Sequence, residues 1–259
     1  MLYDLKNAFR LLVKKPGFRI VAIATLALGV GGTTAIFNVV NGVLLRSLPY
    51  HEPDRILFVQ EYNPELEVPA RWTSSLNFRD FRERNQVFQS MVAWRWSTFS
   101  LTGGDHPERL SGYLVSAGFL PLLGVNPVLG RGFLEEEDQP GGAKAVVISH
   151  RFWQRRFGGD PETVGRALEV DGTPHTIVGI APEGFAYPDE VDLWSTFGFD
   201  YSRPRNLRYL RVLGRLEPTV TLAQARADLK RIAAELEDEF PDTNKGWSIV
   251  AEPLRDSVV

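Results

Sequence analysis

TLAQARADLKRIAAELEDEF, residues 221–240, has the clearest secondary-structure pattern in this 259-residue chain. Its apolar residues recur every three or four positions, which is the spacing of one face of an α-helix. They are Leu222, Ala225, Leu229, Ile232, Leu236 and Phe240. Thr221 and Gln224 form the Thr-x-x-Gln pattern of a capping box, which predicts that the helix begins there. The segment is therefore expected to be an amphipathic helix that packs on a core.

Strands are predicted on both sides of this helix, at Tyr209 to Leu216 and at Trp247 to Pro253. The same order occurs earlier in the chain, with a strand at Ile56 to Tyr62, a helix at Ser75 to Asn85 and a strand at Met91 to Leu101. Two β-α-β units this far apart predict an α+β fold in which a split α/β domain contains an insertion.

The segment between the two units is rich in glycine and proline, and its patterns predict mainly β structure. The predicted strands are Glu108 to Val115, Ala143 to Ser149, Arg166 to Val170 and His175 to Ile180, and the predicted short helices are Gly118 to Leu123 and His150 to Phe157. Asp171-Gly172 separates the last two strands, which is typical of a two-residue hairpin turn. We therefore expect a domain over residues 50–255, with halves at 53–102 and 205–255 and an inserted β subdomain at 103–200.

Residues 20–45 form an uncharged and mostly apolar stretch near the start of the chain. A helix of this length would extend about 39 Å, and the hydrocarbon core of a bilayer is about 30 Å thick. The stretch therefore predicts a transmembrane helix. A cleaved signal peptide is the competing interpretation, but the apolar core is too long for one and no Ala-x-Ala site closes it.

Positive charge is concentrated before this predicted span and not after it. The residues are Lys6, Arg10, Lys14, Lys15 and Arg19, whereas Glu52 and Asp54 dilute the charge of Arg46 and Arg55. This asymmetry predicts a cytoplasmic N-terminus and an exported main domain. Residues 1–19 have apolar residues at helical spacing opposite the basic ones, as in an amphipathic helix lying in the lipid headgroup layer. A plain cytoplasmic helix is the alternative.

Small residues recur every fourth position inside the predicted span, at Ala27, Gly31 and Ala35. This spacing lets the backbone of another helix approach closely, so it predicts a helix-packing face. Small residues are also common in membrane spans without such a role, and that alternative stays open.

The composition excludes several classes of function. The chain has 44% hydrophobic and 24% charged residues, a net charge of −3 and no cysteine, so it is a globular protein without thiol chemistry and without the basic excess of a nucleic-acid-binding protein. It contains no Gly-x-x-x-x-Gly-Lys-[Ser/Thr] phosphate loop and no Gly-x-Ser-x-Gly nucleophile elbow. We therefore predict no catalytic, cofactor-binding or metal-binding residues, and no enzyme activity.

Two clusters remain as candidates for binding. The acidic run Glu135 to Asp138 lacks the interleaved spacing of a calcium loop, so a solvated turn is a better interpretation than a metal site. The four histidines share no zinc-ligand spacing. The other cluster is Trp94 and Trp96, with Trp72 upstream. It is either an aromatic binding surface or one strand face that packs on a core or a neighbouring domain, and the second interpretation is favoured.

Short motifs along the whole chain resemble those of a known family. In chain order they are LYDL at 2–5, KPGF at 15–18, TTAIF at 33–37, LLR at 44–46, LPY at 48–50, VSAGF at 115–119, LGV at 123–125, GR at 130–131, FWQRRFGGD at 152–160, VGIAP at 178–182 and GRL at 214–216. As a set they are similar to the start of MacB/FtsX-type ABC transporter permeases, in particular the acidobacterial-type orphan permeases. Each motif alone is weak.

The resemblance implies a first transmembrane helix in the bacterial inner membrane and a MacB-like periplasmic core domain, with porter-like halves around the inserted β subdomain. It also implies a permease that dimerises, packs against further transmembrane helices and couples to a separate cytoplasmic ABC ATPase in export or mechanotransmission. Such permeases continue into further membrane helices, so the chain is expected to be a fragment or a truncated gene product without full transport ability. The alternative function is a single-pass periplasmic binding or adaptor module with no link to ATP.

Overall fold

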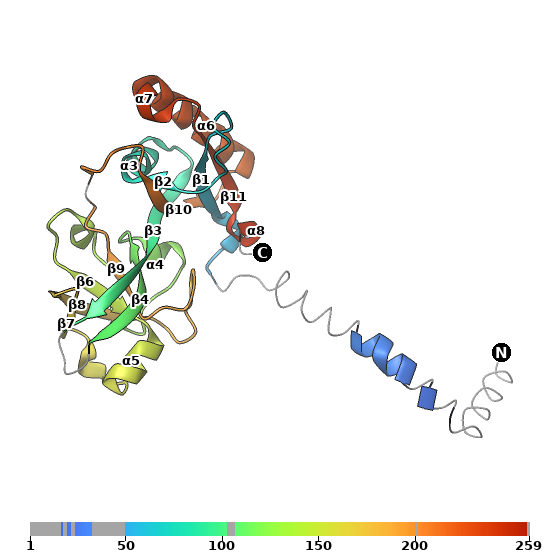
Figure 1. The fold of residues 1–259 in the computed structure, drawn as a ribbon, viewed down its shortest axis with the longest axis vertical. Coiled ribbons are helices and arrows are strands. Elements are labelled where there is room, and N and C mark those ends of the chain that lie inside the picture. Colours follow the sequence, from blue (N-terminus) through green and yellow to red (C-terminus); the bar gives the residue numbers. More distant parts are fainter. Residues whose placement is uncertain are drawn as a thin grey trace. The chain divides into compact units, whose positions relative to one another are not determined.

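The computed structural model describes residues 17, 20–21, 24–32, 50–102, 107–199 and 201–257. The chain divides into two compact units, one of Met1–Leu48 with Val259 and one of Pro49–Val258. Figure 1 shows the described elements of both units.

In the first unit the described residues are helical and exposed. Among the residues that the structure describes, no helix is both long and apolar enough to cross a membrane. Much of the predicted span at 20–45, and all but one residue of the predicted amphipathic helix at 1–19, lie outside the described residues. The transmembrane helix therefore stays a prediction.

In the second unit the two predicted β-α-β units interleave in one sheet. They consist of β1 (Ile56–Tyr62), α3 (Ser75–Arg84) and β3 (Phe88–Leu101), and of β10 (Arg208–Leu216), α6 (Leu222–Glu239) and β11 (Ser248–Pro253). The strand order is β11-β1-β10-β3, and each neighbouring pair is antiparallel. Each unit therefore has a strand of the other between its own two strands, so neither can complete a sheet alone.

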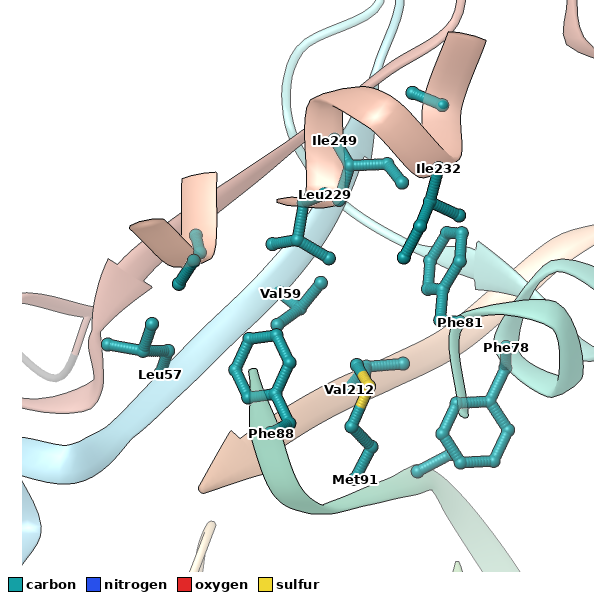
Figure 2. Packing of buried hydrophobic residues seen from close by; sticks show 14 of the residues in the cluster. Leu57, Val59, Phe78, Phe81, Phe88, Met91, Val212, Leu229, Ile232 and Ile249 are labelled. Atoms are coloured by element: carbon teal, nitrogen blue, oxygen red, sulfur yellow. The ribbon is translucent and has the colours of Figure 1, made fainter. Parts of the chain in front are cut away.

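Helices α3 and α6 pack on the same sheet and bury an apolar cluster against it (Figure 2). Leu229 and Ile232 of α6 lie over Val59 of β1 and Phe81 of α3, and neither α6 side chain is exposed to solvent. The capping box predicted at Thr221 is present, with the Gln224 backbone N–H donating to the Thr221 hydroxyl and the Thr221 backbone N–H donating to Gln224 Oε1. Helix α6 thus begins where the sequence predicts it.

The sheet continues without a break into the inserted segment. Its strands are β4 (Glu108–Val115), β5 (Leu129–Gly130), β6 (Ala145–Ile148), β7 (Ala167–Val170), β8 (Thr173–Ile180) and β9 (Leu193–Thr196). The short strand β2 (Thr73–Ser74) precedes the inserted segment and pairs with β10. The 14 residues of β3 pair with β10 in their first half and with β4 in their second. One long strand therefore links the two parts of the domain.

Short helices and turns complete the second unit. They are η2 (Pro53–Arg55), α4 (Phe119–Leu122), η3 (Glu135–Asp138), α5 (His150–Phe157), η4 (Pro161–Thr163), α7 (Pro241–Asn244) and α8 (Leu254–Ser257). A second apolar cluster lies beneath α5, which is at the opposite end of this unit from α7 (Figure 1). The predicted hairpin joins β7 and β8, and positive φ angles of 51° at Asp171 and 72° at Gly172 suit its two-residue turn.

His175, on the β7–β8 hairpin, gives a pH-dependent prediction. Burial lowers the pKa of its imidazole from the ordinary 6.5, and the nearby charge of Lys144 acts in the same direction. Because the folded protein binds this proton more weakly than the unfolded chain, the resulting stability is present above about pH 6.5 and is lost as pH falls through the lowered pKa. We expect His175→Gln to remove this loss, since Gln does not titrate and can still donate to the Thr173 carbonyl.

The measurement is thermal unfolding of both proteins at about pH 8 and pH 5, with the melting temperature of the variant taken relative to wild type. This difference should become more favourable to His175→Gln at the lower pH. The same difference at both pH values would contradict the prediction.

Candidate functional site

A hollow of about 410 Å³ lies at the middle of the sheet, where β10, β3 and β4 are neighbours. The lining residues are Trp72, Trp94, Arg95, Trp96, Tyr113, Asp189, Tyr209 and Arg211. Strand pairing brings four of these residues together, because Trp94 of β3 lies opposite Arg211 of β10 and Trp96 of β3 lies opposite Tyr113 of β4. Trp94 and Trp96 are two residues apart, so both project from one face of β3.

The three tryptophans of this hollow have different environments. Trp94 is buried, and its ring lies 5.7 to 6.0 Å from the rings of Phe58, Phe119 and Tyr187. Trp96 is 50% exposed and Trp72 is 45% exposed. Of the favoured interpretation of the sequence, the packing on a core is therefore right for Trp94. Trp96 is exposed, and nothing in the described part of the chain tests whether it faces a neighbouring domain.

Positive charge dominates the polar lining. Arg95 and Arg211 form no ion pair with a carboxylate in the part of the chain that the structure describes. The guanidinium carbons of Arg95 and Arg203 lie 6.0 and 5.3 Å from the ring centroid of Tyr209. Burial lowers the pKa of Arg95, and the charge of Arg203 lowers it further. Arg203 does not line this hollow, and it lines a smaller one together with Arg95, Phe197, Phe199 and Tyr209.

Asp189 is the one acidic residue in the lining, and it already has a partner. The Tyr113 hydroxyl donates a hydrogen bond of 2.8 Å to Asp189 Oδ2. Burial raises the pKa of Tyr113, and the hydrogen bond to Asp189 raises it further. Tyr113 therefore stays protonated at neutral pH, and its hydroxyl orients Asp189. A protonated phenol is a poor general base or nucleophile, so Tyr113 is a poor candidate for either role.

The acidic run of η3 is structural. Arg131 forms two hydrogen bonds with the Glu137 carboxylate, at 2.6 and 3.0 Å. Asp138 accepts hydrogen bonds from the backbone N–H groups of Ala117, Phe197 and Gly198. Both acids are buried, so the expectation of a solvated turn is wrong for them. The described residues contain no group of three or more His, Asp or Glu side chains placed to hold a metal ion.

The predicted helix-packing residues lie in the other unit of the chain. Ala27 and Gly31 fall within the helical residues 24–32, and Ala35 lies outside the described residues. Nothing in the described part of the chain tests their packing against another helix, which stays a prediction. Of the hollow, the sequence pointed only to the tryptophans. Tyr113, Asp189 and Arg211 are far from them in the sequence, and only the strand pairing brings them together.

A family model for the MacB-like periplasmic core domain matches residues 20–232. The chain belongs to this family. Its match to the pyoverdine export ATP-binding/permease protein PvdT of Pseudomonas syringae pv. tomato has 24% identity over 160 residues, covering 57% of this chain and 23% of PvdT. This MacB-like domain therefore corresponds to less than a quarter of that relative.

Solved structures share the fold of this MacB-like domain. The periplasmic region of MacB from Actinobacillus actinomycetemcomitans has a TM-score of 0.57 and 13% identity, with 79% of this chain and 90% of that chain covered. The extracellular domain of the noncanonic ABC-type transporter YknZ from Gram-positive bacteria has a TM-score of 0.54 and 15% identity, with 75% and 99% covered. These likenesses confirm the mixed α/β architecture that the resemblance implied.

Proposed function

We propose that the chain is part of the permease component of an ABC-type export or mechanotransmission system, and that its second unit is an extracytoplasmic domain that couples to a separate ATPase. The observation that carries this proposal is the family match over residues 20–232. The shared fold of the MacB periplasmic region supports it.

The membrane arrangement is part of the same proposal. Residues 20–45 span the bacterial inner membrane with the N-terminus in the cytoplasm, and residues 50–255 form the periplasmic core domain. Ala27, Gly31 and Ala35 face another transmembrane helix of the intact permease, which forms a homodimer. The charge asymmetry around the apolar stretch and the family match support this arrangement.

The construction of the second unit suits transmission of movement. Strand β3 runs through both parts of the sheet, and β10 pairs with it in the first part. A continuous hydrogen-bonded sheet with packed cores on it moves as one body, because such interiors deform little. Movement of a membrane helix could therefore be passed to the whole domain.

The test is reconstitution of the whole gene product with its ABC ATPase in proteoliposomes. We compare the wild-type protein with a form in which a short flexible linker replaces residues 50–257. We expect both forms to insert, and only the wild type to change its rate of ATP hydrolysis when substrate is present. The same response from both would contradict the proposal, and a gene product that binds no ATPase would favour the alternative of a periplasmic adaptor module.

A further inference from the structure

The smaller hollow lies on the other face of the sheet from the tryptophans. Arg95 stands between Trp94 and Trp96 on β3, and successive side chains of a strand leave opposite faces. Arg95 lies opposite Leu114 of β4, and both line the smaller hollow. The other lining residues are Phe197, Gly198, Phe199, Arg203 and Tyr209. This lining has two guanidinium groups and, among the residues that the structure describes, no carboxylate.

The two guanidinium groups have no acceptor in the described part of the chain. Neither Arg95 nor Arg203 forms an ion pair there. Neither donates a side-chain hydrogen bond to a described residue. Burial lowers the pKa of Arg95, and the charge of Arg203 lowers it further, so the two cations repel each other. An anion between them would relieve this repulsion.

Aromatic rings form the walls of the smaller hollow. Phe197 and Phe199 are stacked with ring centroids 4.5 Å apart, and the guanidinium carbons of Arg95 and Arg203 lie 6.0 and 5.3 Å from the ring centroid of Tyr209. Arg95 is half-buried, whereas Arg203 is exposed. Charges beside apolar walls attract an opposite charge more strongly than the same charges in bulk water. The walls therefore strengthen the attraction of this arginine pair for an anion.

Size and charge together select the ligand. The smaller hollow has a volume of about 70 Å³, and one water molecule occupies about 30 Å³ of the liquid, so there is room for a single small polyatomic group. Each guanidinium group can make two parallel hydrogen bonds to a carboxylate or a phosphate. A phosphomonoester has a charge of about −1.5 to −2 at pH 7 and three acceptor oxygens, so it matches two cations better than a carboxylate does.

We infer that the smaller hollow binds a phosphate group, with Arg95 and Arg203 donating hydrogen bonds to its oxygens. Inorganic phosphate and the phosphomonoester headgroup of a lipid share this chemistry, and the experiments below separate the two sources. The inference goes beyond the proposed function. It needs neither the ATPase nor a membrane orientation, so its failure would leave those proposals untouched.

The first experiment is equilibrium dialysis of radiolabelled inorganic phosphate at low salt, which leaves charge interactions least screened. The full chain is held in nanodiscs of zwitterionic lipid, with empty nanodiscs as the blank. We expect unlabelled phosphate to displace the label at a concentration at least about tenfold lower than acetate, which has one charge. Equal displacement by phosphate and acetate, or no binding of phosphate up to about 10 mM, would overturn the inference.

The source of the phosphate group is tested by changing the lipid. Nanodiscs with phosphatidic acid present a phosphomonoester headgroup, and nanodiscs with phosphatidylglycerol, matched for surface charge, do not. Weaker binding of the labelled phosphate in the first than in the second assigns the smaller hollow to a lipid headgroup. Equal binding in both assigns it to a soluble phosphate. Both results support the inference, because the label binds in either case.

The second experiment uses variants of two exposed arginines. Arg203→Gln should keep the fold and weaken phosphate binding at least about fivefold, because it removes one of the two cations. Arg211→Gln is the matched control, since this arginine also lacks an ion pair in the described part of the chain but lines the larger hollow. Arg203→Lys keeps the charge without the paired donors and should bind with intermediate affinity. Equal phosphate affinities of Arg203→Gln and Arg211→Gln would overturn the inference.

Discussion

Replacing Leu229 by Asp is expected to destabilise the second unit strongly. Leu229 has no exposed surface, and it lies against β1 beside Val59 and Phe88 (Figure 2). The substitution removes a buried apolar side chain and places an unpaired carboxylate in the core, which lowers the free energy of unfolding by about 4–5 kcal/mol or more. Domains of this size have about 5–15 kcal/mol in total. The measurement is urea unfolding followed by circular dichroism.

The matched control is Lys230→Asp, one residue further along the same helix. Lys230 is exposed, so Lys230→Asp brings the low helix propensity of Asp into α6, as Leu229→Asp does, but buries no charge. We expect its free energy of unfolding to fall by about 1 kcal/mol or less. Arg226 would serve less well, although the pattern of α6 places it opposite the core. Its Nε donates to the Ala251 carbonyl of β11 at 3.0 Å, so its removal also breaks a hydrogen bond between elements. Similar unfolding midpoints for Leu229→Asp and Lys230→Asp would contradict the assigned helix face.

The second large effect is expected at Arg205, which lies in the loop before β10 and is buried with its partners. It pairs with Asp80 of α3 and donates a hydrogen bond of 2.7 Å to Asn77 Oδ1. Its guanidinium carbon lies 3.8 Å from the ring centroid of Phe240. Arg205→Met keeps much of the side-chain volume but leaves the buried Asp80 with the weaker contact to Arg84, at 3.4 Å. We expect a loss of about 3–5 kcal/mol in the free energy of unfolding.

The control is the same substitution at an exposed ion pair. Arg166 pairs with Asp160 at 2.6 Å, but both side chains are more than a third exposed. Arg166→Met should therefore lower the free energy of unfolding by no more than about 1 kcal/mol. Urea unfolding of both variants gives the comparison. If the double variant Arg205→Met with Asp80→Asn is as unstable as the sum of its single changes, the two residues do not interact as the structure indicates.

Arg205 belongs to a buried polar network that no sequence pattern indicated. Asn77 also donates to Asn244 Oδ1 at 2.8 Å and to the buried Glu61, whose carboxylate lies 3.4 Å from Arg208 Nε. These residues come from β1, α3, β10 and α7. Charged residues are mostly exposed in folded proteins, so the sequence alone predicts that each of these lies in solvent. No local pattern indicates that two of them form a buried ion pair.

Local periodicity and turn chemistry, by contrast, could be read directly. The sequence by itself determined the helix at α6, its capping box at Thr221 and the hairpin turn at Asp171 and Gly172. Each of these depends on residues within a few positions of one another, so the chain carries the signal locally.

Only the tertiary structure decided what those elements meet. Insertion of β10 between β1 and β3, continuation of β3 into the second part of the sheet, and the assembly of Trp96, Tyr113 and Arg211 around one hollow all depend on strand pairing across long stretches of sequence. Pairing of distant strands depends on which apolar faces can be buried together and in which register. That is a property of the whole folded chain, and no single segment of the sequence contains it.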